Sequence, residues 1–136
     1  TLVRPEARMS GVEIEIDVAS NVPDVYGDEE VLRQALLNLL RNAIQASRPG
    51  SLPVKVSVYP DGGSVRLLIR DHGQGIPSDV QQKVFDLYFT TKKDGTGVGL
   101  ALVQQAVEMH GGTIGVQSEP DQGALFTISL PALASV

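Results

Sequence analysis

The spacing of apolar residues changes several times along the chain, and this succession most constrains the fold. Apolar residues recur at every second position in strands and at every third or fourth position in helices. The strand pattern occurs at 12–18, 53–59, 64–70, 113–118 and 124–130, and the helical pattern at 29–47, 98–109 and, more briefly, 79–85. Because the strands come in runs without regular βαβ alternation, the predicted fold class is an α+β two-layer sandwich.

Residues that cap helices or form turns stand between these segments. Asp28 is well placed to cap the helix 29–47, and His110 with the glycines after it ends the helix 98–109. The motif "PDGG" between 53–59 and 64–70 predicts a β-hairpin.

Length and composition exclude several classes of protein. The 136 residues suit one domain, and the net charge of −5 argues against nucleic acid as a partner. No apolar run reaches the ~18–20 residues of a membrane span, and the absence of cysteine excludes disulfides and suits a reducing cytoplasm. Two histidines are too few for a His-based metal cluster, and the first residue, Thr1, suggests a piece of a longer polypeptide.

The helix 29–47 carries a stripe of amides opposite its apolar face. The stripe consists of Gln34, Asn38, Arg41, Asn42 and Gln45. A solvated face is one interpretation, but such a face favours Glu and Lys, whereas Asn is a weak helix former. The amide oxygen of Asn is a hard, neutral ligand suited to Mg²⁺, which also binds nucleotide phosphates.

Two glycine-rich segments follow in the second half of the chain. Asp71 ends an apolar strand and precedes Gly73 and Gly75, which is either a simple turn or the floor of a pocket for a flat ligand. A carboxylate there could accept a hydrogen bond from an exocyclic amino group such as that of adenine. The second segment, "TTKKDGTGVGLALV", leads into a helix whose N-terminus attracts phosphate, unless it is only a flexible loop.

Together, these motifs resemble the nucleotide-binding boxes of the GHKL ATPase and kinase superfamily. "NLLRNAIQAS" resembles the N box, "DHGQG" the first glycine box, "VFDLYFTTK" the F box and "GTGVGLALV" the second glycine box. The resemblance covers about residues 10 to 131, and it is greatest to the catalytic ATP-binding domain of sensor histidine kinases. It implies the Bergerat fold: a mixed, mostly antiparallel sheet of about five strands, covered on one face by about three helices, with a mobile ATP lid.

The resemblance also implies a role for each matching residue. Asn42 would be the Mg²⁺ ligand with Asn38 beside it, and Asp71 would bind the adenine amino group while Gly73 and Gly75 give the ring room. The lid, residues 86–97, would be poorly ordered without nucleotide. The complete predicted nucleotide site comprises Asn38, Asn42, Gln45, Asp71, Gly73, Gly75, Ile76, Lys92, Thr96, Gly97, Val98, Gly99 and Leu100.

Two positions depart from the family pattern. The residue after Gly123 is often a threonine that touches an adenine-linked water, and here it is Ala124. The F box often carries Pro-Phe where this chain has Leu87 and Tyr88, which affects how Phe85 and Phe89 would pack the lid against the body.

The residue four positions before Asn42 separates kinases from hydrolases. Relatives that hydrolyse ATP carry a Glu there, which can act as general base on water. This chain has Asn38, an amide that accepts no proton at neutral pH, so transfer to a nucleophile such as a neutral imidazole is favoured. Neither His72 nor His110 has the context of a phosphoacceptor.

The prediction is therefore the catalytic domain of an ATP-dependent protein-histidine kinase with ATP and Mg²⁺ as cofactors. Residues 1–10 would link the domain, 11–136, to a dimerisation and phosphoacceptor domain outside this chain. The isolated domain would be a cytoplasmic monomer, the parent a homodimer acting on a response regulator, with its membrane attachment left open. The alternatives are a serine-directed kinase of the same fold and a nucleotide-gated interaction module without transfer chemistry.

Overall fold

The computed structural model describes residues 12–47, 50, 52–73, 75–76, 81–85, 99–119 and 122–132. Within them, two α-helices and one 3₁₀-helix accompany a five-stranded sheet. The elements are, in chain order, β1 (Ile14–Val18), α2 (Glu29–Ala46), β2 (Val54–Asp61), β3 (Ser64–Arg70), η1 (Gln81–Lys83), α3 (Gly99–Met109), β4 (Thr113–Glu119) and β5 (Gly123–Pro131). The predicted linker 1–10 and lid 86–97 lie outside the described residues.

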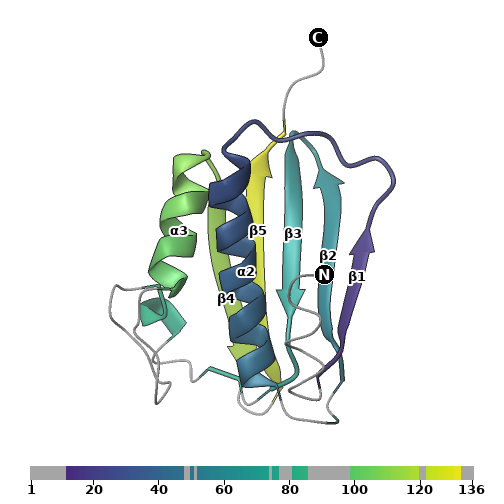
Figure 1. Ribbon diagram of the computed structural model, residues 1–136, viewed down its shortest axis with the longest axis vertical. Coiled ribbons are helices and arrows are strands. Elements are labelled where there is room, and N and C mark those ends of the chain that lie inside the picture. Colours follow the sequence, from purple (N-terminus) through teal and green to yellow (C-terminus); the bar gives the residue numbers. More distant parts are fainter. Residues whose placement is uncertain are drawn as a thin grey trace.

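The sheet has the strand order β1-β2-β3-β5-β4, and both α-helices lie against one of its faces (Figure 1). β1 and β2 are parallel and joined through α2, since parallel neighbours need a crossover connection. The other pairs are antiparallel. The predicted α+β sandwich with a mixed, mostly antiparallel sheet is therefore confirmed, with a 3₁₀ turn where a third helix was expected.

The core lies between the helices and the sheet. Its most buried large side chains come from both layers and are Leu39, Val54, Ile69, Val103 and Val107. Phe85 packs edge-on against Phe126 of β5, with ring centroids 6.1 Å apart. Of the two aromatic residues expected to pack the lid, Phe85 thus contacts the core, and Phe89 lies outside the described residues.

The predicted turns and caps are present. Asp28 caps α2 by accepting hydrogen bonds from the N–H groups of Glu30 and Val31. The hairpin loop is shorter than "PDGG", because Pro60 and Asp61 still pair with β3 and only two glycines turn the chain. α3 ends at Met109, and Gly111 follows with φ of +74°.

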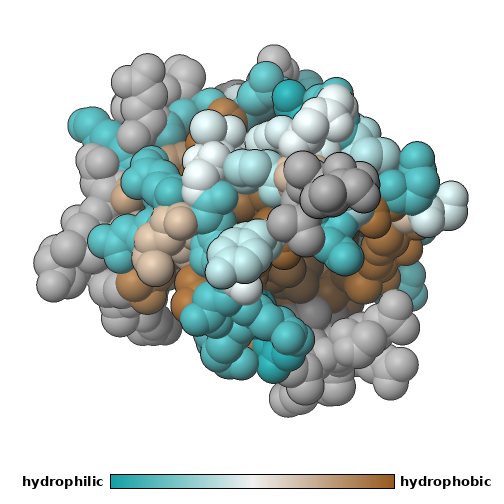
Figure 2. Space-filling model, turned by 90° about the horizontal axis from the view of Figure 1, so that it is seen from above, coloured by the Kyte–Doolittle hydropathy of each residue, from teal (hydrophilic) through white to brown (hydrophobic). Residues whose placement is uncertain are grey.

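The end of the molecule at which α2 begins and α3 ends is mostly polar, with hydrophobic surface near its middle and on its right (Figure 2). β1 lies on that right side in Figure 1, and its Ile16 and Val18 are exposed. No helix in the described segments is long and apolar enough to cross a bilayer.

Candidate nucleotide site

Asp71 follows the last residue of β3 and is held against the first residues of β5. Its side chain is only 3% exposed, the lowest exposure of any charged residue that the structure describes. Its backbone N–H donates to the carbonyl of Ala124 at 3.0 Å, and the N–H of Ala124 donates back to Asp71 Oδ1 at 3.1 Å. The N–H of Gly73 donates to the same oxygen at 3.0 Å. These bonds fix both the position and the direction of the carboxylate.

Both hydrogen bonds that described residues donate to this carboxylate go to Oδ1. Burial raises the pKa of Asp71, because it removes water from the ionised form. The bonds from Gly73 and Ala124, and more weakly the charges of His72 and Arg70, act in the opposite direction on the pKa. A ligand N–H group at Oδ2 would replace part of the lost hydration.

Gly73 brings the Asp71 loop against the C-terminal end of α2. A Cβ at Gly73 would overlap the carbonyl group of Ala46, which is the last residue of the helix. The missing side chain therefore allows close packing between loop and helix, and the predicted room for a ring stays a prediction. Gly75, with φ of +78°, has a backbone conformation that residues other than glycine rarely adopt.

A network of polar groups holds the next part of the loop. The N–H of Ile76 donates to Ser118 Oγ at 2.6 Å, and that hydroxyl donates to the carbonyl of Gly123 at 2.8 Å. Gln81 Nε2 donates to the carbonyl oxygens of Ile76 and Ser118 at 3.0 and 2.8 Å. Neither Ser118 nor Gln81 was predicted from the sequence, although Ser118, a polar residue on the buried side of β4 opposite Ala124, was a usable signal.

The amide stripe of α2 approaches this loop at its C-terminal end. Asn38 and Asn42 are half-buried, whereas Gln45 is exposed. The two asparagines are one turn apart, so their side chains lie on the same face of the helix. Because Gly73 touches Ala46, one turn beyond Asn42, the structure brings the amides and Asp71 to the same end of the molecule.

The start of α3 completes the described part of the predicted site. Gly99 and Leu100 are half-buried in the first turn, and Leu100 packs against the core, as does Ile76. Figure 1 shows α3 beginning toward the lower part of the molecule, where α2 and β3 end. The remaining predicted residues, Lys92, Thr96, Gly97 and Val98, lie outside the described residues, as do Leu87 and Tyr88.

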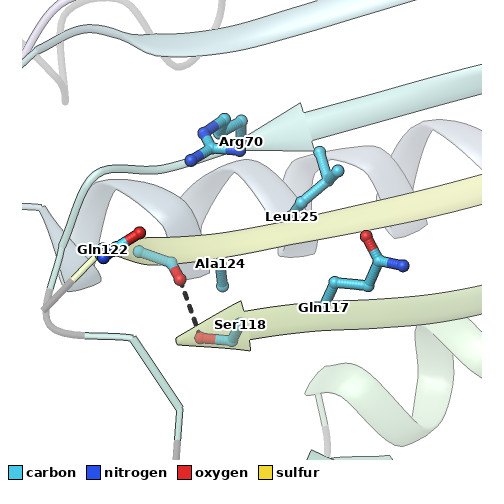
Figure 3. Close-up of a pocket in the computed structure, with 7 residues that line it drawn as sticks. Arg70, Gln117, Ser118, Gln122, Ala124 and Leu125 are labelled. Carbon is cyan, nitrogen blue, oxygen red and sulfur yellow. Dashed lines mark hydrogen bonds between the residues drawn. The ribbon is translucent and has the colours of Figure 1, made fainter. Parts of the chain in front are cut away.

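A pocket of about 260 Å³ lies at the same end of the sheet, beside Arg70 and Gln117 (Figure 3). Leu125 pairs with Arg70 and Gln117, and its neighbours along β5, Ala124 and Phe126, are buried. Because side chains alternate between the two faces of a strand, Leu125 lies on the sheet face away from the helices, and the pocket opens mainly on that face. None of the predicted ligand residues lines it, so it is distinct from the predicted nucleotide site around Asp71. Its lining includes Gly123 and Ala124 at the start of β5, where Ala124 also supports Asp71.

Comparison with known proteins places this arrangement in a family. The model of the histidine kinase-, DNA gyrase B- and HSP90-like ATPases matches residues 27–134. The sensor histidine kinase ZraS of Escherichia coli K12 is 39% identical over 130 residues, which are 96% of this chain and 28% of that protein. The chain thus spans less than a third of this curated relative.

Solved structures agree with the sequence match. The mycobacterial sensor histidine kinase MprB superposes with a TM-score of 0.84 and 37% identity, over 98% of this chain and 91% of that chain. Full-length ShkA in complex with AMPPNP superposes with a TM-score of 0.85 and 36% identity, over 99% of this chain and 29% of that chain. The chain belongs to the histidine kinase-, DNA gyrase B- and HSP90-like ATPase family, as an ATP-binding domain of the histidine kinase type.

Proposed function

We propose that this domain binds ATP with Mg²⁺ and donates the γ-phosphoryl group to a histidine in a separate helical domain of its parent protein. The reaction would take place in the cytoplasm, and a response regulator would then receive the phosphoryl group. The likeness to sensor histidine kinases over nearly the whole chain supports this assignment. The single observation that carries nucleotide binding is the buried carboxylate of Asp71, which is fixed through Oδ1.

Asp71 is proposed to recognise adenine. An ionised carboxylate only accepts hydrogen bonds, and the exocyclic amino group of adenine is a donor. Because Ala124 contributes its backbone N–H to the site, the absence of the family's threonine at this position leaves the support of Asp71 intact. The complex of ShkA with AMPPNP, an analogue of ATP, is consistent with nucleotide binding in this fold.

Asn42 is proposed as the protein ligand of Mg²⁺. Among the described residues, no three His, Cys, Asp or Glu side chains form a group that could hold a metal alone. A single neutral amide fits an ion that arrives with the nucleotide and keeps phosphate and water ligands. The ion would neutralise charge on the phosphates, Asn42 would orient them, and Lys92 and Gly97 are proposed as further phosphate contacts.

Asn38 favours transfer over hydrolysis. It lies one turn before Asn42 on the same half-buried face of α2, where a carboxylate could deprotonate water. An amide cannot do so, whereas a neutral imidazole needs no base because its nitrogen lone pair is already available. The phosphoacceptor is proposed to lie outside this chain. His72 sits beside Asp71, and both ring nitrogens of His110 already have hydrogen-bond partners.

The test is a reconstitution with labelled ATP. The domain alone should label nothing, and addition of a separate His-containing helical hairpin from the parent should yield acid-labile phosphate on the hairpin. Acid-stable phosphate would indicate a serine-directed kinase. Failure of the full-length parent to label any residue, despite ATP binding, would indicate a nucleotide-gated interaction module.

Asn42→Asp should lower the affinity for Mg-ATP by about tenfold or more. The change adds a negative charge beside the phosphates, and like charges about 4 Å apart repel by up to ~4 kcal/mol at the effective dielectric of a protein surface. Calorimetric titration with and without Mg²⁺ checks this, because the ion neutralises part of the phosphate charge and the loss from repulsion should therefore be larger without it. Gln105→Glu, which adds a charge at an exposed position of α3, is the control. Unchanged transfer in Asn42→Asp would remove the proposed metal role.

A further inference from the structure

His110 follows the last residue of α3, and both of its ring nitrogens are engaged. Nδ1 lies 2.7 Å from the carbonyl oxygen of Ala106, and Nε2 lies 2.9 Å from the backbone nitrogen of Asp28. A carbonyl only accepts and a backbone N–H only donates, so Nδ1 must carry the proton and Nε2 must be bare. The two contacts together select one neutral tautomer.

These contacts join two helices that are distant in the sequence. Asp28 is the N-cap of α2, and Ala106 lies in the last turn of α3. The imidazole therefore ties the beginning of α2 to the end of α3. Both lie at the upper end of the molecule in Figure 1, whereas Asp71 follows β3, which ends at the lower end.

Gly27 supplies an independent sign that the ring is closely fitted. A Cβ at Gly27 would overlap Cδ2 of His110, so the chain entering α2 passes directly against the imidazole. His110 is half-buried in this position. Only glycine at position 27 allows the backbone to pass this close to the imidazole of His110.

We propose that His110 is a positioning residue that fixes how far α3 is displaced along α2, and thereby aligns the groups that receive the triphosphate. This rests on the proposed function. Apolar packing between the helices is non-directional and resists sliding weakly, whereas two hydrogen bonds at one end are directional. Asn42 lies about 21 Å along α2 from Asp28, and Gly99 about 16 Å along α3 from His110, at 1.5 Å per residue.

The adenine side should not depend on this link. Asp71 is bound to β5 through Ala124 and its loop packs on α2 through Gly73, and neither contact involves α3. Loss of the link should therefore weaken binding of the triphosphate while leaving binding of the base and ribose unchanged.

Two substitutions that differ in where they place a polar group test the proposal. His110→Asn retains a donor near the position of Nδ1 but has no acceptor that reaches Asp28. His110→Gln places an amide oxygen near the position of Nε2 and can accept the bond from Asp28. Titrations with Mg-ATP and with adenosine, on chains shown by circular dichroism to be folded, compare both variants with the wild type.

His110→Asn should weaken Mg-ATP binding at least fivefold and adenosine binding less than twofold, and His110→Gln should restore Mg-ATP binding to within twofold of wild type. Equal losses for both ligands, no loss for Mg-ATP, or a Gln variant as weak as the Asn variant would overturn the proposal. Wild-type protein that does not bind Mg-ATP would instead overturn the proposed function.

A second set of measurements applies if His110→Asn does not fold. Nitrogen-15 NMR of the wild-type imidazole should show a protonated Nδ1 and a bare Nε2, and the opposite tautomer would overturn the link. Gly27→Ala should reproduce the selective loss of Mg-ATP affinity without altering His110. A Gly27→Ala chain with wild-type Mg-ATP affinity would also overturn it.

Discussion

Asp71→Asn is expected to weaken ATP binding by about 10- to 150-fold without lowering the melting temperature. A hydrogen bond to a charged group contributes about 1.5–3 kcal/mol, which corresponds to that range of affinity. The substituted side chain also has a fixed orientation. Its amide oxygen must take the place of Oδ1, because the N–H groups of Gly73 and Ala124 both require an acceptor. Its NH₂ group then occupies the position of Oδ2 and meets the amino group of adenine, another donor.

The same orientation predicts a change in base preference. Inosine triphosphate carries a carbonyl oxygen where ATP carries the amino group, and this oxygen can accept a hydrogen bond from the new NH₂ group. The ratio of ATP to inosine triphosphate affinity should therefore fall in Asp71→Asn. Equal weakening of both nucleotides would contradict a base-specific contact. Asp24→Asn, which removes a carboxylate from an exposed loop, serves as the control for charge.

The effect of Asp71→Asn on stability follows from the direction of the pKa shift. Burial raises the pKa of Asp71 in the folded protein, so the folded state binds its proton more tightly than the unfolded state does. As pH rises from the ordinary value of 3.8 to the raised folded value, ionisation of Asp71 therefore reduces stability. Asn has no such ionisation. The melting temperature of the variant relative to wild type should be higher at pH 7 than at pH 3, and a constant difference would contradict this.

Local patterns sufficed to predict the elements of the fold. Period-two alternation located the strands, and the ends of α2 and α3 followed from Asp28 and from the glycines after His110. These signals depend on neighbours in the sequence, which is why they can be read from it. The strand order did not follow from them, because it depends on pairings such as Ile69 with Phe126, 57 residues apart by their numbers. The family resemblance implied only a mixed, mostly antiparallel sheet of about five strands and no strand order.

The candidate site was only partly predictable for the same reason. Asp71 stood out because a carboxylate ended an apolar strand, but its partner Ala124 lies 53 residues away. Ser118 supports Ile76 across 42 residues, and His110 contacts Asp28 across 82. No spacing rule connects such positions. Gly73 was predicted to give a ring room, which stays a prediction, and its packing on Ala46 is a contact that only the folded chain contains.

Gly123→Ala is expected to reduce both stability and ATP affinity. Gly123 has φ of +86°, and a Cβ there would overlap the carbonyl oxygen of Asp71 and approach His72 Cα to 2.9 Å. These neighbours are backbone atoms, so no flexible side chain can move away. The strain should lower the free energy of unfolding by about 2–4 kcal/mol. Because relief requires Asp71 to shift from β5, nucleotide binding should weaken with it.

Gly62→Ala separates the two causes of this loss, which are the backbone strain of a positive φ and the overlap with Asp71. Gly62 also has positive φ, at +61°, but nothing lies within 4 Å of a Cβ built there. That variant should lose only about 1–2 kcal/mol from backbone strain and should bind ATP like wild type. Chemical denaturation and nucleotide titration of both variants measure the difference, which is the contribution of close approach to Asp71. If Gly123→Ala were no less stable than Gly62→Ala, the close approach of Gly123 to Asp71 would not affect stability, and the start of β5 would not be what holds Asp71 in place. The loss of affinity in Asp71→Asn would then have to arise from the carboxylate alone.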